Sequence, residues 1–233
     1  MAGTERFAIY FAPSEDDPIW HFGIKWLGRD PVSGKTLPQP DVPGLTREEL
    51  AAATESPRHY GFHATLKPPF HLADETTPEQ LRQATAAFAA SRAPFDGPPV
   101  SVQRIDRFQA FAFIDFSPEM DRLAADCVTA FDRFRSPPDE ADLAKRRERG
   151  LSERQERYLQ EWGYPYVLEE FRFHMTLLGS TRDEAVHAAV SAYLKPRTAA
   201  FANQPLRADA ICLYRQESDK APFLLVERFP FRV

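Results

Sequence analysis

Hydrophobic and polar residues alternate along two short stretches of the chain, and both stretches contain the same five-residue pattern. Phe62-His63-Ala64-Thr65-Leu66 and Phe173-His174-Met175-Thr176-Leu177 share the sequence Phe-His-x-Thr-Leu. Successive side chains of a β-strand point to opposite faces, so the apolar residues of each stretch share one face and the histidine and threonine share the other. The pattern predicts two strands that rest on a core and present an imidazole beside a hydroxyl.

The surrounding pattern predicts an order of elements that occurs twice. In residues 61–116 and again in residues 172–231, the motif strand precedes a helix and two β-type runs joined by a turn. Such an internal repeat predicts an α+β fold with two pseudo-symmetric lobes, each an antiparallel-rich sheet with helices. The two motifs then meet in a cleft between the lobes. Residues 1–233 form a single bilobal domain in this interpretation.

A strongly charged segment separates the two halves. Residues 136–162 contain Lys145-Arg146-Arg147 and show helical periodicity, so we expect a helical insertion. A charge run of this kind is typical of a solvated helix face. The alternative is a lid that brings cations to an anionic substrate.

Composition narrows the class of protein. A chain of 233 residues with 43% hydrophobic residues and 19 Phe can bury a sizeable core. The net charge of −5 argues against general nucleic-acid binding, which needs a basic surface. Cys127 and Cys212 lack metal-ligand spacing and indicate reduced thiols. With no signal-peptide pattern and no long apolar run, we expect a cytoplasmic monomer without a membrane partner.

The paired motifs suggest proton-transfer chemistry that needs no cofactor and no metal. An imidazole titrates near pH 6.5, so one histidine can accept a proton while the other donates one. The hydroxyls can donate hydrogen bonds to oxygen atoms on which negative charge develops. We therefore predict a catalytic set of His63, Thr65, His174 and Thr176. The alternative is two structural histidines that each bond to a neighbouring threonine.

Three further residues are candidates for binding a substrate. Lys67 lies two residues after Thr65, and Arg172 lies two residues before His174, so each is expected on the face of its motif. Both cations suit a phosphate, Arg in bidentate fashion and Lys as a point charge. Tyr10, on a predicted opening strand, is a weaker candidate. For all three the alternative is a role in a salt bridge, the core or the surface.

Two His-x-Thr motifs in a duplicated α+β chain resemble the two-histidine (2H) phosphoesterase superfamily. Three segments resemble a bacterial branch of unknown function, DUF1045, that is often associated with phosphonate-utilisation operons; they are Arg6–Pro13, Trp26–Asp30 and Arg58–Phe70. The resemblance implies metal-independent cleavage of phosphodiesters, often 2′,3′-cyclic phosphates. It also implies that the two motif histidines are catalytic and that the two threonines bind phosphate. The charged insertion widens the spacing of the motifs, so the nucleic-acid substrates of other branches are not assumed.

The sequence hypothesis is a metal-independent phosphodiesterase for a small cyclic phosphodiester, either a cyclic nucleotide or a cyclic sugar phosphate. One rival is a metal hydrolase that uses His59, His63 and His71, although their spacing fits no standard ligand pattern. A second rival is a protein that binds a phosphorylated or nucleotide ligand without turnover. The sequence contains no glycine-rich phosphate loop of the nucleotide-triphosphate type, which argues against ATP-driven chemistry.

Overall fold

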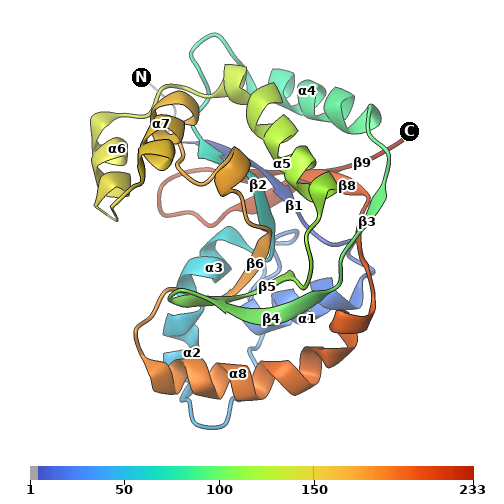
Figure 1. Ribbon diagram of the computed structural model, residues 1–233, viewed down its shortest axis with the longest axis vertical. Coiled ribbons are helices and arrows are strands. Elements are labelled where there is room, and N and C mark those ends of the chain that lie inside the picture. The colour runs from blue at the N-terminus through green and yellow to red at the C-terminus, as the bar shows by residue number, and fades with distance from the viewer. Residues whose placement is uncertain (1–4, 149) are drawn as a thin grey trace.

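The computed structural model describes residues 5–148 and 150–233. It is an α+β protein in which helices lie beside a mainly antiparallel sheet (Figure 1). The strands are β1 (Arg6–Phe11), β2 (Ala64–Phe70), β3 (Phe95–Gly97), β4 (Val100–Ile105), β5 (Phe108–Phe113), β6 (His174–Leu178), β7 (Leu206–Ala208), β8 (Ala210–Gln216) and β9 (Leu224–Pro230). The α-helices are α1 (Pro18–Leu27), α2 (Arg47–Ala53), α3 (Glu55–Tyr60), α4 (Pro78–Ala90), α5 (Pro118–Ala130), α6 (Glu140–Arg147), α7 (Glu153–Trp162) and α8 (Glu184–Thr198).

One seven-stranded sheet organises the fold, in the order β4-β5-β6-β2-β1-β8-β9. Every pairing recorded between these strands is antiparallel, which confirms the predicted α+β class. The prediction of two separate sheets needs a correction. The motif strands β2 and β6 are the inner edges of the two parts, and the single pair Ala64–Met175 joins them into one sheet.

The order of elements repeats in the two halves of the chain. Each half consists of a motif strand, a helix, a short strand and a hairpin, with β2, α4 and β3 to β5 in the first half and β6, α8 and β7 to β9 in the second. The hairpin of the first half pairs with β6, and the hairpin of the second half reaches β2 through β1. Each hairpin therefore extends the part of the sheet that contains the other half's motif. The short strands β3 and β7 pair with each other.

The helices divide between the two parts of the sheet. Helices α4 and α5 pack on the part formed by β2, β1, β8 and β9, whereas α1 and α8 pack on the part that contains β4 and β6 (Figure 1). Helix α4 begins as predicted, with a capping box between Thr77 and Gln80. Helices α6 and α7 fall within the charged insertion, and α6 buries none of its side chains.

Among the described residues, no helix is both long and apolar enough to cross a bilayer.

Candidate active site

The two Phe-His-x-Thr-Leu motifs meet where the two parts of the sheet join. In both motifs the phenylalanine, the central residue and the leucine are buried, whereas the histidine and the threonine are half-buried. This alternation follows the two-residue period of a strand. Hydrophobic burial on one face thus fixes which way His63, Thr65, His174 and Thr176 point.

The register brings the four polar residues of the motifs together. Ala64 pairs with Met175, and antiparallel partners run in opposite directions. Extending this register by one residue places Thr65 across from His174, and His63 across from Thr176. On the other side of β6, the partners of His174 and Thr176 are the small residues Ala112 and Ala110. The site therefore presents two imidazoles and two hydroxyls on one face, beside a strand whose side chains leave room above them.

The backbone fixes the tautomer of both motif histidines in the same way. The Nδ1 atom of His63 lies 2.8 Å from the carbonyl oxygen of Gly61, and that of His174 lies 2.7 Å from the carbonyl oxygen of Arg172. A carbonyl only accepts, so Nδ1 donates in both residues. The Nε2 atom of each neutral ring then holds a lone pair that can accept a proton. The Thr65 hydroxyl, 3.2 Å from Nε2 of His63, donates to that lone pair.

Aromatic residues enclose His63. Its ring stacks on the ring of Tyr10, with 3.7 Å between centroids, and the rings of Tyr214 and Tyr60 lie 6.2 and 6.4 Å away. Burial lowers the pKa of His63 to about 3, against the opposing effect of the Gly61 carbonyl, and the nearby charges of His174 and Arg29 lower this pKa as well. His63 is therefore neutral at pH 7, with an Nε2 lone pair that can accept a proton.

His174 is held less tightly. Its ring lies 5.2 Å from that of Phe108, in a tilted arrangement. Burial lowers its pKa too, and the hydrogen bond to the Arg172 carbonyl opposes that effect. The two histidines thus share chemistry and orientation but differ in their surroundings, since His63 stacks on a buried tyrosine and His174 touches a phenylalanine at the edge of β5.

Tyr10 supports His63 and does not face the solvent. The sequence suggested Tyr10 as a substrate contact, but its side chain is fully buried, with the His63 ring on one side and the Tyr214 ring 4.9 Å away. Burial raises the pKa of the Tyr10 hydroxyl well above its usual value. In this structure Tyr10 is buried beneath the His63 ring and offers no exposed surface for a ligand.

The prediction that Lys67 faces the site is wrong. The register between β1 and β2 shifts by one residue, so Tyr10 pairs with Thr65 but Ile9 pairs with Lys67. This bulge turns Lys67 toward α5. Its Nζ donates to the carbonyl of Val128 at 2.9 Å and to Asp132 at 3.1 Å, and the side chain is almost fully buried. Burial lowers the pKa of Lys67 to about 8.

Arg172, which the sequence placed on the face of its motif, is exposed. Its guanidinium borders a pocket of about 640 Å³ that the β4–β5 hairpin and the start of α5 complete. Phe171 and Phe173 line the pocket beside it, and Gln103 and Phe116 line it from the hairpin and the residues after it. The lining of this pocket includes Arg172 but none of the four polar motif residues. The role of Arg172 in binding stays a prediction.

The histidines of the metal-hydrolase alternative are engaged separately. Nε2 of His59 lies 3.0 Å from the Gln216 amide nitrogen, and Nδ1 of His71 donates to the Glu5 carbonyl at 2.8 Å. Nδ1 of His63 faces the carbonyl of Gly61. Within residues 5–148 and 150–233, no three His, Cys, Asp or Glu side chains are grouped as metal ligands. The geometry therefore gives that alternative no support.

Two residues near His63 were missed by the sequence analysis. Arg29 and Tyr214 are buried, and both influence the electrostatics of the His63 neighbourhood. They lie in a loop after α1 and on β8, far from the motifs in sequence. Neither belongs to a periodic pattern that points to the site. The only signal was the resemblance of the segment Trp26–Asp30 to the DUF1045 branch.

The comparison with protein families decides the membership of the chain. Residues 65–224 match the family described as "Protein of unknown function (DUF1045)". The chain belongs to the DUF1045 family. This match spans both motif threonines and the second histidine, and it confirms the branch that the sequence resembled.

Two curated relatives carry the same name. A "Ribose 1,5-bisphosphate phosphokinase PhnN" of Janthinobacterium sp. (strain Marseille) is 41% identical over an alignment of 233 positions, which covers 97% of this chain and 51% of the relative. A protein of that name from Laribacter hongkongensis (strain HLHK9) is 33% identical over 172 residues, covering 74% of this chain and 39% of the relative. The DUF1045 chain thus spans about half the length, or less, of these relatives.

Solved structures show weaker similarity. The structure of E. coli LigT complexed with 3'-AMP aligns with a TM-score of 0.43 and 13% identity, and covers 99% of each chain. LigT complexed with NADP+ aligns with a TM-score of 0.39 and 12% identity over the whole of both chains.

Proposed function

We propose that the chain is a metal-independent phosphodiesterase of the two-histidine type that opens a small cyclic phosphodiester. The observation that carries the proposal is the antiparallel pairing of the two motif strands at Ala64 and Met175. This pairing presents two imidazoles with the same tautomer, each across from the threonine of the other motif. Two proton-transfer groups flanked by hydroxyl donors are what hydrolysis of a phosphodiester requires.

In the proposed reaction His63 is the proton acceptor and His174 the proton donor. A water oxygen forms a bond to phosphorus while His63 takes the water proton through Nε2. The phosphorus–oxygen bond of the ring breaks, and protonated His174 gives its Nε2 proton to the leaving oxygen. The product is a phosphomonoester with a free hydroxyl. Bound phosphate raises the pKa of both imidazoles because its negative charge favours their protonated forms, so His174 can start the cycle protonated.

The hydroxyls and Arg172 would bind the phosphate. Thr65 and Thr176 lie on the same face as the histidines and can donate to the non-bridging oxygens, on which charge grows during attack. Arg172 reaches the same face from the loop before β6 and can pair with a further anionic group. We place the cyclic phosphate at the junction of the two parts of the sheet, over the paired motif strands.

The name of the curated relatives suggests a substrate within this class. A kinase for ribose 1,5-bisphosphate needs that compound, and opening a 1,2-cyclic phosphate on ribose 5-phosphate would supply it. A cyclic ribose phosphate is therefore the first substrate to test, ahead of cyclic nucleotides. We do not extend the kinase activity to this chain. The segment from Gly28 to Thr36 resembles a phosphate-binding loop of kinases, but it has five residues between its two glycines where that loop has four. In addition, Thr36 pairs with Arg29 in a β-bridge at the point where such a loop would enter a helix.

The test is turnover of a panel of cyclic phosphodiesters in EDTA, comprising ribose cyclic phosphates and 2′,3′-cyclic nucleotides. We expect activity that survives EDTA and is lost in His63→Ala and in His174→Ala. Activity that EDTA removes and a divalent metal restores would contradict the proposal. Binding of a panel member without turnover, equally in wild type and His63→Ala, would favour the alternative of a phospho-ligand binding protein.

A further inference from the structure

Arg29 is a buried cation that has no carboxylate partner in the described part of the chain. Its Nε donates to the carbonyl of Arg58 at 2.8 Å, and its Nη2 donates to the carbonyls of His59 and Phe223 at 3.1 and 2.9 Å. Only 6% of its surface is exposed. Carbonyl groups solvate the guanidinium but do not neutralise it, so its positive charge acts on the groups around it.

Through these three carbonyls Arg29 binds the segments that hold His63 in place. Arg58 and His59 form the last turn of α3, which ends at Gly61 with a φ of 86°. A side chain at Gly61 would come within 2.9 Å of Pro31 and 3.4 Å of the Arg29 guanidinium, so the chain passes against both. The carbonyl of Gly61 is the acceptor that orients His63. Arg29 thus links three segments that surround this imidazole, namely the end of α3, the turn at Gly61 and the residue before β9. We call these linked segments the frame of His63.

Two buried polar atoms beside this frame lack a partner. Nη1 of Arg29 and the hydroxyl of Tyr214 have no hydrogen-bond partner among the described residues, although both are buried. Leaving such groups unpaired in a buried site is unfavourable. Tyr214 is also near enough to Arg29 for each to affect the other's pKa. A protein that needed Arg29 only for packing could replace it with an apolar residue and avoid this cost.

We infer that Arg29 is a positioning residue for His63, which it orients through the Gly61 turn and keeps beside a positive charge. The inference rests on the proposed function for its catalytic meaning. The groups that face His63 support it, since they offer no negative charge. They are Tyr10 from β1, Tyr214 from β8, Tyr60 from α3, His174 from β6, and Arg29 itself.

The test follows the histidine rings of the full chain by NMR as a function of pH, which needs no turnover. In the wild type, His63 should stay neutral at pH values where His174 already titrates. Arg29→Gln should raise the pKa of His63, because removal of a nearby cation favours the protonated imidazole. Arg58→Gln is the matched control. It removes the side-chain charge of a neighbouring residue. Only the backbone carbonyl of Arg58 takes part in the frame, so the pKa of His63 should stay unchanged.

Arg29→Lys separates charge from position. Lysine keeps the charge but cannot donate to three carbonyls with a rigid fork, so we expect the pKa of His63 to stay low while kcat falls about tenfold and KM changes little. This variant also serves if Arg29→Gln does not fold. An Arg29→Gln protein that titrates like Arg58→Gln, or an Arg29→Lys protein with wild-type kcat, would overturn the inference. A panel without any substrate would defeat the proposed function, but the titrations would still decide the part played by Arg29.

Discussion

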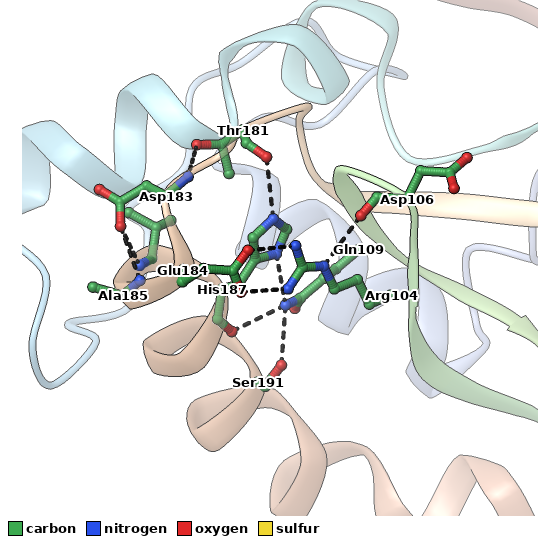
Figure 2. Close-up of polar contacts among 10 residues, drawn as sticks. Arg104, Asp106, Gln109, Thr181, Asp183, Glu184, Ala185, His187 and Ser191 are labelled. Atoms are coloured by element: carbon green, nitrogen blue, oxygen red, sulfur yellow. Dashed lines mark hydrogen bonds and ion pairs between the residues drawn. The ribbon is translucent and has the colours of Figure 1, made fainter.

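Histidines in two regions of this protein use opposite hydrogen-bonding schemes. At the junction of the motifs, His63 and His174 donate through Nδ1 to a carbonyl two residues earlier. Between α8 and β5, His187 accepts at Nδ1 from the amide of Gln109 and donates through Nε2 to the carbonyl of Thr181 (Figure 2). In the first scheme Nε2 is the accepting nitrogen, and in His63 it receives only the Thr65 hydroxyl, whereas in the second scheme Nε2 donates to a backbone carbonyl.

The difference distinguishes a histidine available for chemistry from one that holds the fold together. The Gln109 amide that bonds His187 also bonds the carbonyl of His187 and the hydroxyl of Ser191, so β5 is fastened to α8 (Figure 2). His187 is almost fully buried, and its neighbours determine its tautomer. The motif histidines depend on the backbone alone for their tautomer, and their side-chain neighbours set the pKa instead.

The largest expected effect is the contrast between His63→Asn and His187→Asn. His63→Asn removes the proton acceptor, and general acid–base groups contribute about 10²–10⁴-fold to rate, so turnover should fall by that factor. His187→Asn breaks buried hydrogen bonds and should lower the free energy of unfolding by about 1–3 kcal/mol. Turnover per folded molecule should then stay near that of the wild type. Substrate turnover and urea unfolding, measured on the same samples, check both expectations.

The comparison fails if the two substitutions have similar effects. A His63→Asn protein that loses stability to the same degree as His187→Asn but retains turnover would place His63 among the structural histidines. His174→Asn is the internal control, since it belongs to the same scheme as His63 and should share its loss of rate with little change in stability.

The next effect concerns the hydroxyl of the first motif. Thr65 donates to Nε2 of His63 without substrate and would donate to a phosphate oxygen with substrate bound. Removal of one donor to a developing oxyanion costs about 10²–10³-fold in rate, so Thr65→Val should lose about that much in kcat. Thr65→Ser keeps the hydroxyl and should retain most of the rate. Equal losses in the serine and valine variants would show that shape, not the hydroxyl, matters.

Much of the fold and the four motif residues could be predicted from local pattern. The alternation around His63 and around His174 is a short-range signal, and burial of the apolar face enforces it. Repetition of the pattern implied a shared site, and the register between β2 and β6 brings the motifs together. The capping box at Thr77 likewise needs only four residues to be read.

The remaining features depend on long-range packing that a local pattern does not encode. The bulge that redirects Lys67 is a property of the pairing of β1 with β2. Arg29 reaches the site because the loop after α1 packs against α3 and the chain before β9. Helix α3 has only six residues and contains Pro57, so no local pattern indicates a helix there.

A smaller effect is the acid sensitivity of the fold that the surroundings of His63 predict. Burial lowers the folded-state pKa of His63 to about 3, below its ordinary value of 6.5. Between those values the unfolded chain binds a proton that the folded chain does not, so stability is lost as pH falls from about 6.5 toward 3. The slope for this group is at most about 1.4 kcal/mol per pH unit. His63→Gln should show a shallower loss in urea titrations over this window, and an unchanged slope would contradict the burial described here.

The smallest effect at neutral pH is expected for Lys67→Met, which tests whether Lys67 stabilises the fold and does not bind the substrate. Its ammonium bonds Val128 and Asp132 under α5, and Asp132 keeps a second partner, Arg135, when Lys67 is replaced. We expect kcat and KM to stay at wild-type values and the free energy of unfolding to change by about 1 kcal/mol. A large rise in KM would instead make Lys67 a phosphate ligand.

Alkaline pH sharpens the test of Lys67. Burial lowers its folded-state pKa to about 8, below the ordinary 10.5, so the unfolded chain holds the extra proton between these values. The contribution of this group therefore makes the wild type more stable as pH rises from 8 to 10.5. Lys67→Met lacks that contribution and should gain less stability over the same range. Parallel stability curves for the two proteins would show that Lys67 is solvated like a surface lysine, and the assignment to the fold would then be wrong.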